Sequence, residues 1–93
     1  MEIEVGQVVI SKRGRDKGKY FVVLSVEGEY VFLADGQLRP LNKPKKKKAK
    51  HIQPTKTVIT AVAGGGIKTD ADIRKWLLLF KSNEEVSNCL RTM

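Results

Sequence analysis

The stretch GRDKGKYFVVLSVE, residues 14–27, joins a charged, glycine-flanked loop to the most strand-like segment of the chain. Aromatic and β-branched residues between Lys19 and Glu27 favour a pleated strand. Apolar side chains fall on both faces of this strand, with Tyr20, Val22, Leu24 and Val26 on one face and Phe21 and Val23 on the other. A strand that is buried on both faces is typical of a tightly curled sheet or a small barrel.

Shorter strand-like segments lie on either side of this one. Gly6–Ser11 precedes the charged loop, and Tyr30–Ala34 follows a turn at Gly28. The dipeptide Asp35-Gly36 then favours a two-residue type I′ hairpin, because both of its central positions need positive φ. The chain is therefore expected to return as a fourth strand over Gln37–Leu41.

This fourth strand is expected at an edge of the sheet or to stop at Pro40, which has no N–H to donate. A last strand is expected near Thr57–Ala61. Short strands with tight turns predict a mainly β fold, a small five-stranded barrel formed by residues 1–63.

The C-terminal part has a different pattern. Gly64–Gly66 predicts a flexible hinge within residues 64–68, since it lacks the spacing of a phosphate-binding loop. Thr69 can cap a following helix that begins with Asp70 and Asp72. One apolar stripe of this helix, expected to pack on the barrel or on a partner, consists of Ile73, Trp76, Leu77 and Phe80. The rest of 69–93 is a tail that either adds a short second helix or frays.

Composition excludes several classes of protein. The 93 residues are 41% hydrophobic, but no apolar run approaches the roughly 18 residues of a membrane span. The acidic start does not resemble a signal peptide, so we expect a cytoplasmic protein with no membrane partner. Cys89 and His51 are the only residues of their kinds, which predicts no internal disulfide, no metal centre and no cofactor. Without a catalytic set, we expect neither an enzyme nor a small-molecule substrate.

Positive charge is concentrated in the first half of the chain. The net charge is +8, and residues 12–50 alone hold twelve lysines or arginines against four acidic residues. The basic residues occur in two runs, a distribution that predicts a polyanionic partner.

The first run is the loop that precedes the strongest strand. Its cations and glycines, which suit phosphate contacts and close approach of the backbone, are Lys12, Arg13, Gly14, Arg15, Lys17, Gly18 and Lys19. Asp16 is expected to hold the shape of the loop through local hydrogen bonds rather than to touch a ligand. A merely solvated turn is the alternative.

The second run, within residues 42–51, is expected to form a solvated loop. Its candidate binding residues, together with an arginine that lies between the two runs, are Arg39, Lys43, Lys45, Lys46, Lys47, Lys48, Lys50 and His51. A solubilising loop or a localisation signal is the alternative for the lysines, and His51 either contacts a base or simply borders a strand. The four strand aromatics, Tyr20, Phe21, Tyr30 and Phe32, are expected in the core, so no stacking platform for bases is predicted.

Three features that occur in this order carry a family resemblance: the Gly-Arg-Asp-x-Gly loop, the Asp-Gly dipeptide followed by an arginine, and the Lys-Pro and lysine run that ends in Lys-His. GQVVISKRGRDKGKYFVVLSV resembles a KOW motif, and LADGQLRPLNKPKKKKAKHI is similar to the equivalent part of the large-subunit ribosomal proteins of the L-fourteen-e type and of short bacterial KOW-domain RNA-binding proteins. The resemblance covers roughly residues 5–56. It implies an SH3-like barrel that binds RNA, in particular ribosomal RNA, through the motif loop and the lysine-rich segment.

Two functions from different classes follow. The first is a ribosome-associated RNA-binding protein, whose C-terminal helix could meet ribosomal-protein neighbours. The second is a protein-interaction module of the transcription-elongation type, in which the barrel or the apolar helix stripe binds a protein and the lysines only solubilise the chain. Replacing Lys45–Lys48 with glutamine is expected to separate the two.

Overall fold

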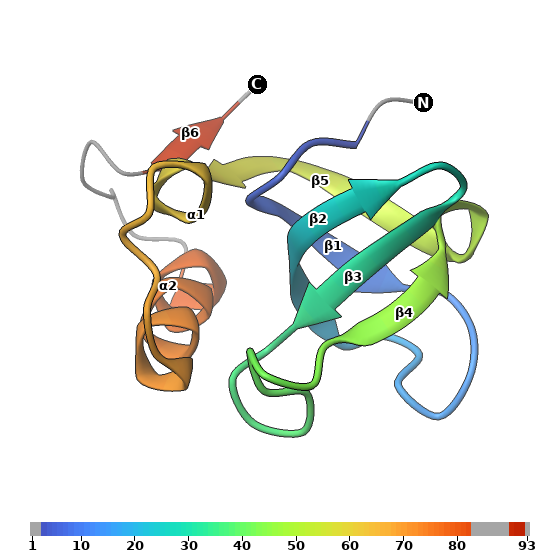
Figure 1. Cartoon of the computed structure of the whole chain (residues 1–93). Coiled ribbons are helices and arrows are strands. Elements are labelled where there is room, and N and C mark those ends of the chain that lie inside the picture. Colours follow the sequence, from blue (N-terminus) through green and yellow to red (C-terminus); the bar gives the residue numbers. More distant parts are fainter. Residues whose placement is uncertain (1–2, 83–89, 93) are drawn as a thin grey trace.

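Figure 1 shows the computed structural model of the protein, which describes residues 3–82 and 90–92. Six strands form one antiparallel sheet in the order β4-β3-β2-β1-β5-β6. The strands are β1 (Gln7–Ser11), β2 (Tyr20–Glu27), β3 (Tyr30–Ala34), β4 (Lys45–Lys48), β5 (Ile52–Ile59) and β6 (Leu90–Thr92). The helical elements are the 3₁₀-helix η1 (Ala49–His51), α1 (Thr60–Ala63) and α2 (Asp70–Ser82). The mainly β fold that the sequence predicts is confirmed.

The sheet is strongly curled and buries apolar side chains on both of its faces (Figure 1). The inner face holds a cluster formed by Val9, Phe21, Val23, Val31, Leu33 and Ile52. The outer face of β1, β2 and β5 contributes to a second cluster with α2, whose fully buried members are Val8, Val22, Ala34, Ile59, Ile73 and Leu77. The two-sided burial expected for β2 is therefore present over its first half, where α2 covers the second side. It is wrong for Val26, which lies beyond a register shift between Val23 and Ser25 and has 41% of its surface exposed.

The apolar stripe of α2 packs on the sheet. Ile73 and Leu77 are fully buried, while Trp76 and Phe80 are half-buried at the margin of the same cluster. The ring of Phe80 meets the ring of Tyr20 edge-on, with centroids 5.3 Å apart. The predicted helix and its stripe are thus confirmed, and the stripe is used inside the chain.

The start of α2 is capped as the sequence predicts. The hydroxyl oxygen of Thr69 accepts a hydrogen bond from the Asp72 N–H at 3.2 Å. The Asp72 carboxylate in turn accepts the N–H groups of Lys68 and Thr69, each at 3.0 Å. These backbone hydrogen bonds lower the pKa of Asp72. Reciprocal capping of this kind satisfies N–H groups that a helix start leaves without partners.

The strand expected over Gln37–Leu41 is wrong. Asp35 accepts the backbone N–H groups of Gln37 and Arg39 on one carboxylate oxygen, both at 2.9 Å. The Arg39 carbonyl accepts the N–H groups of Asp35 and Gly36. These bonds close residues 35–39 into a compact turn, so the two-residue hairpin does not form and residues 35–44 form a loop.

The solvated loop expected for the lysine run is wrong as well. Lys45–Lys48 forms β4, which pairs antiparallel with β3 in the register Leu33↔Lys45 to Tyr30↔Lys48. A strand needs only the backbone for its ladder, so hydropathy could not reveal this one. Charged side chains are also typical of sheet edges, where they discourage pairing with other chains.

The five-stranded barrel also needs correction. The sheet has six strands and does not close, since β4 and β6 lie at its two ends. The last expected strand, near Thr57–Ala61, is wrong in extent: β5 begins at Ile52, and Thr60–Ala63 is helical. The described end of the tail, Leu90–Thr92, is neither helical nor frayed but pairs with β5 as β6.

Gly36 fixes how closely α2 approaches the 35–44 loop. Its φ is +79°, and an added Cβ would lie 2.5 Å from the Asp70 carbonyl oxygen and 2.9 Å from Arg74 Cγ. The Gly36 carbonyl also accepts a hydrogen bond from the Arg74 guanidinium, and the Asp70 carboxylate accepts the Leu41 N–H at 2.7 Å. The loop is therefore held against the first turns of α2 by close packing and by these two hydrogen bonds.

Gly36→Ala should lower the free energy of unfolding by about 3 kcal/mol, because left-handed strain and steric overlap add. Gly28→Ala is the control: φ is +61° there, but no atom lies within 4 Å, so the cost should be about 1 kcal/mol. Urea unfolding followed by the fluorescence of Trp76, the single tryptophan, measures both. Equal costs would show that the contact with α2 is unimportant.

Candidate nucleic-acid interface

A buried lysine joins the first loop to β4. Lys47 lies opposite Val31 in the β3–β4 ladder, and only 8% of its surface is exposed. Its ammonium group donates to the Ser11 hydroxyl at 2.6 Å, to the Arg13 carbonyl at 2.5 Å and to the Asp16 carboxylate at 2.9 Å. All three of its hydrogens are thus used. We call Ser11, Asp16, Lys45 and Lys47 the Lys47 anchor.

Asp16 is the anionic centre of this anchor. One carboxylate oxygen accepts from Lys47 and from the Ser11 hydroxyl at 2.7 Å, and the other forms an ion pair with Lys45 at 3.2 Å. Burial by itself raises the pKa of Asp16, but the hydrogen bonds from Ser11, Lys47 and Lys45 outweigh it, so the pKa is well below its usual range. Asp16 holds the shape of the loop, as expected, but through the anchor.

The loop between β1 and β2 is a closed structure. Gly14 and Gly18 both have a φ of +87°, the backbone conformation expected of these glycines. The N–H of Lys17 donates to Gly14, that of Gly18 to Ser11 and that of Lys19 to Asp16. These three N–H groups are engaged inside the loop, so they are not available to a phosphate.

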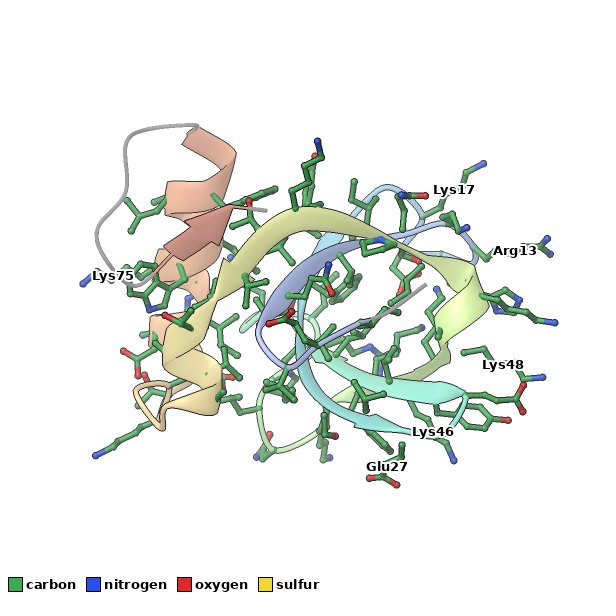
Figure 2. All side chains as sticks on the ribbon, turned by 90° about the horizontal axis from the view of Figure 1, so that it is seen from above. Arg13, Lys17, Glu27, Lys46, Lys48 and Lys75 are labelled. Carbon is green, nitrogen blue, oxygen red and sulfur yellow. The ribbon has the colours of Figure 1, made fainter. Side chains whose placement is uncertain are left out.

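Several cations gather at the end of the sheet where this loop meets η1. The N–H of Lys12 donates to the His51 carbonyl at 2.9 Å, which ties the two segments together. We call Lys12, Arg13, Lys48, Lys50 and His51 the first basic group. Partial burial and the charges of Arg13, Lys50, Lys47 and Lys48 lower the pKa of His51. Figure 2 shows Arg13, Lys17 and Lys48 along one edge of the molecule, with Lys75 at the opposite side.

A second set of cations lines a hollow between the two loops. The hollow has a volume of about 470 Å³ and is floored by Phe21. The cations that line it, which we call the second basic group, are Arg15, Lys19, Arg39 and Lys45. The 12–19 and 35–44 loops leave the sheet on the same side (Figure 1), which is why residues far apart in sequence meet here.

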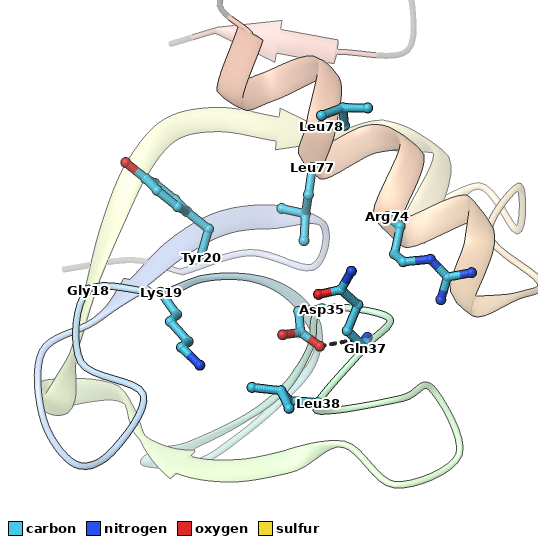
Figure 3. Close-up of a pocket in the computed structure, with 9 residues that line it drawn as sticks. All are labelled: Gly18, Lys19, Tyr20, Asp35, Gln37, Leu38, Arg74, Leu77 and Leu78. Atoms are coloured by element: carbon cyan, nitrogen blue, oxygen red, sulfur yellow. Dashed lines mark hydrogen bonds between the residues drawn. The ribbon is translucent and has the colours of Figure 1, made fainter.

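A neighbouring hollow of about 660 Å³ lies between these loops and α2 (Figure 3). It shares Lys19 and Leu38 with the first hollow and adds Arg74 from α2. Leu38 and Leu78, with 65% and 68% of their surfaces exposed, form part of its rim. The cations and open walls of the two hollows suit an extended, flexible ligand better than a small enclosed one.

The structure therefore brings most of the sequence-predicted residues together, but not all in the same role. Lys47 is buried and belongs to the anchor, whereas Lys17 and Lys43 are exposed on the two loops. Sequence reasoning missed Ser11 and the pairing of Asp16 with Lys47. An acidic residue within a basic loop was the available signal, since such a residue needs a local charge partner.

Comparisons with known proteins leave the family open. No family model matches the sequence, and no curated protein matches it either.

Cys89 lies outside the described residues. Within the described part, the structure has no helix long and apolar enough to cross a membrane and no cluster of histidine, cysteine or carboxylate side chains suited to a metal ion.

Lys47→Met should lower the free energy of unfolding by about 3 kcal/mol, because it leaves Asp16 buried with one cation fewer. Lys46→Met, at the exposed neighbouring position, should cost less than about 1 kcal/mol, the value of its contact with Tyr30. Denaturant midpoints of the two variants provide the measurement. A loss of equal size in both would show that the anchor does not stabilise the fold.

The anchor should also make stability depend on pH. Because the pKa of Asp16 is lower in the folded chain than its ordinary 3.8, the unfolded state takes up the proton first as the pH falls. The contribution of Asp16 is therefore complete above about pH 4 to 5 and is lost below that range.

Asp16→Asn should be less stable than the wild type at pH 7 and should lose less stability between pH 5 and pH 2, as measured by urea unfolding across that range. Asp72 has a lowered pKa in both proteins, so the profile of the variant should be shallower rather than flat. Parallel profiles for the two proteins would contradict the assignment.

Proposed function

We propose that the chain binds RNA, with ribosomal RNA as its target, through the two basic groups on either side of the Lys47 anchor. The observation that carries the proposal is this convergence: a rigid loop and a lysine strand present cations side by side, while the acidic residue between them is neutralised internally. The resemblance of residues 5–56 to KOW-domain RNA-binding proteins supports the same reading, and with it an SH3-like ancestry for the open, curled sheet.

The chemistry of the two groups suits phosphates. Lysine offers a compact positive charge, and arginine offers a planar fork that can hold two phosphate oxygens. Asp16 is already paired, so it adds little repulsion against an approaching anion. The 12–19 loop contributes cations to both groups, with Arg13 near Lys48 in the first group and with Arg15 and Lys19 in the hollow that Arg39 and Lys45 also line. A ribosomal location would make this a structural or assembly role in translation rather than a catalytic one.

A protein-interaction module is the second candidate. The apolar stripe of α2 is not available to bind another protein, because Ile73 and Leu77 are buried against the sheet. The exposed Leu38 and Leu78 beside the larger hollow are the observation that favours it. In that case the lysines of β4 would only protect a sheet edge. An apolar peptide bound there would not use the cations that line the two hollows, among them Lys19 and Arg74.

The proposed test avoids the Lys47 anchor, because changing all of Lys45–Lys48 would also remove both cations that pair with Asp16 and so destabilise the fold. The test variant is Arg13→Gln/Lys48→Gln/Lys50→Gln, which removes three charges of the first basic group. The control is Lys56→Gln/Lys68→Gln/Lys75→Gln, which removes three exposed lysines elsewhere. Both variants have the same net charge.

The wild type should bind single-stranded RNA with a log–log salt slope near −4, from about six phosphate contacts. The test variant should lose about 2 units of slope, which corresponds to about 100-fold weaker binding at 0.1 M salt, and the control should stay near the wild type. Anisotropy titrations measure this. In cells, crosslinking and sequencing should recover ribosomal RNA with the wild type. No binding by the wild type, or equal losses in both variants, would refute the proposal.

A further inference from the structure

The outer face of β3 and β4 carries two aromatic rings among lysines. In the β3–β4 ladder Tyr30 is opposite Lys48 and Phe32 is opposite Lys46, so these four side chains share one face. On the other side of β3, Glu27 and Ser25 of β2 occupy the same two rows. We call Tyr30, Phe32, Lys46 and Lys48 the aromatic–lysine face. Lys45 and Lys47 alternate with it and point to the opposite side, toward Asp16.

These two rings are not core residues, contrary to the expectation from the sequence. Phe21 is fully buried inside the curled sheet, and Tyr20 packs against α2. Tyr30 and Phe32 are half-buried and belong to neither apolar cluster. Figure 1 shows why: α2 lies near the start of β2 and the end of β3, where Ala34 joins its cluster, whereas β4 and the start of β3 lie farther from it. Tyr30 and Phe32 are therefore outside the part of the sheet that α2 covers.

The position of Lys46 shows that the Tyr30 ring is accessible from outside. The Lys46 ammonium lies over the ring, 4.4 Å from its centroid. A cation in this position is attracted by the negative face of the ring. The face of the Tyr30 ring is thus occupied by the Lys46 ammonium group. Because the Lys46 side chain is long and exposed, it can move aside when a base binds.

From this geometry we propose that the aromatic–lysine face stacks unpaired RNA bases on Tyr30 and Phe32, while Lys46 and Lys48 hold the adjoining phosphates. The inference rests on the proposed function, and it makes the preferred substrate single-stranded or looped RNA rather than a continuous duplex. Lys48 belongs both to this face and to the first basic group, so one strand can run from the sheet face onto η1 without a gap in positive charge.

A stacked base should displace the Lys46 ammonium group from the Tyr30 ring, because base stacking is the stronger of the two contacts. Stacking of a base on an aromatic side chain strengthens binding by about 5- to 150-fold. The exposed cation–π contact that the base would displace corresponds to only about 2- to 5-fold. The ammonium group of Lys46 is then released to a phosphate, which adds to the gain. Stacking does not depend on base identity, so little sequence preference is expected.

Charge decides between the possible occupants of this face. An apolar peptide would meet Lys46 and Lys48 on both rows and would gain nothing from them. Glu27, exposed at the β2 side, would repel phosphates there and so directs the backbone of a bound strand toward β4. A duplex keeps its bases inside and cannot use the rings, so it would bind by charge alone.

The experiment compares three probes of about twelve nucleotides: an oligoadenylate, an abasic strand with the same number of phosphates, and an RNA duplex. The wild type should bind the oligoadenylate at least tenfold more tightly than the abasic strand. Tyr30→Leu should reduce this difference at least fivefold, because only the Phe32 ring remains, and should leave binding of the abasic strand and the duplex unchanged. Tyr30→Phe, which keeps the ring, should behave like the wild type.

Ring-proton NMR signals of Tyr30 in the wild type provide a measurement that needs no variant, and they should move upfield when oligoadenylate binds. Equal affinity for the oligoadenylate and the abasic strand, with a normal salt slope and no upfield shift, would overturn the stacking inference and leave the proposed function intact. If the wild type binds none of the three probes, the proposed function fails, and this inference fails with it.

Discussion

Lys47 places an ammonium group where the curled sheet leaves little room for water, and the rest of the architecture depends on how that charge is satisfied. Its three hydrogens are donated to a β1 hydroxyl, a loop carbonyl and the Asp16 carboxylate. β1 and β4 are three positions apart in the order of the sheet, yet Lys47 reaches Ser11 directly. These side-chain hydrogen bonds therefore connect parts of the sheet that no strand ladder joins, and they fix the loop between β1 and β2.

The same contact sets the electrostatics of the surface. Asp16 would be an exposed negative charge in the middle of a basic loop if it were not paired with Lys47 and Lys45. Because its charge is used inside the protein, the loop presents cations almost exclusively. A pair that stabilises the fold thus also prepares the surface for a polyanion, and its loss would weaken both.

β4 shows how one strand of identical residues can serve different purposes. Strand alternation sends Lys45 and Lys47 toward Asp16 and sends Lys46 and Lys48 to the outer face beside Tyr30 and Phe32. A shift of the register by one residue would exchange these roles and bury the wrong ammonium group.

The sequence by itself determined the elements whose signals are local: the two-faced apolar pattern of β2, the cap at Thr69, the stripe of α2 and the left-handed glycines of the first loop. Hydropathy and turn propensity report on neighbouring residues, so they could not show that Asp35 would bind its own loop instead of starting a hairpin. Nor could they show that four lysines would form a strand, because β4 pairs with residues 12 to 18 positions earlier and the side-chain partners of Lys47 lie 31 to 36 positions earlier. Only the tertiary structure decided which lysine is buried, which aromatics stay accessible and which cations stand side by side, because these depend on where the curled sheet brings distant segments together.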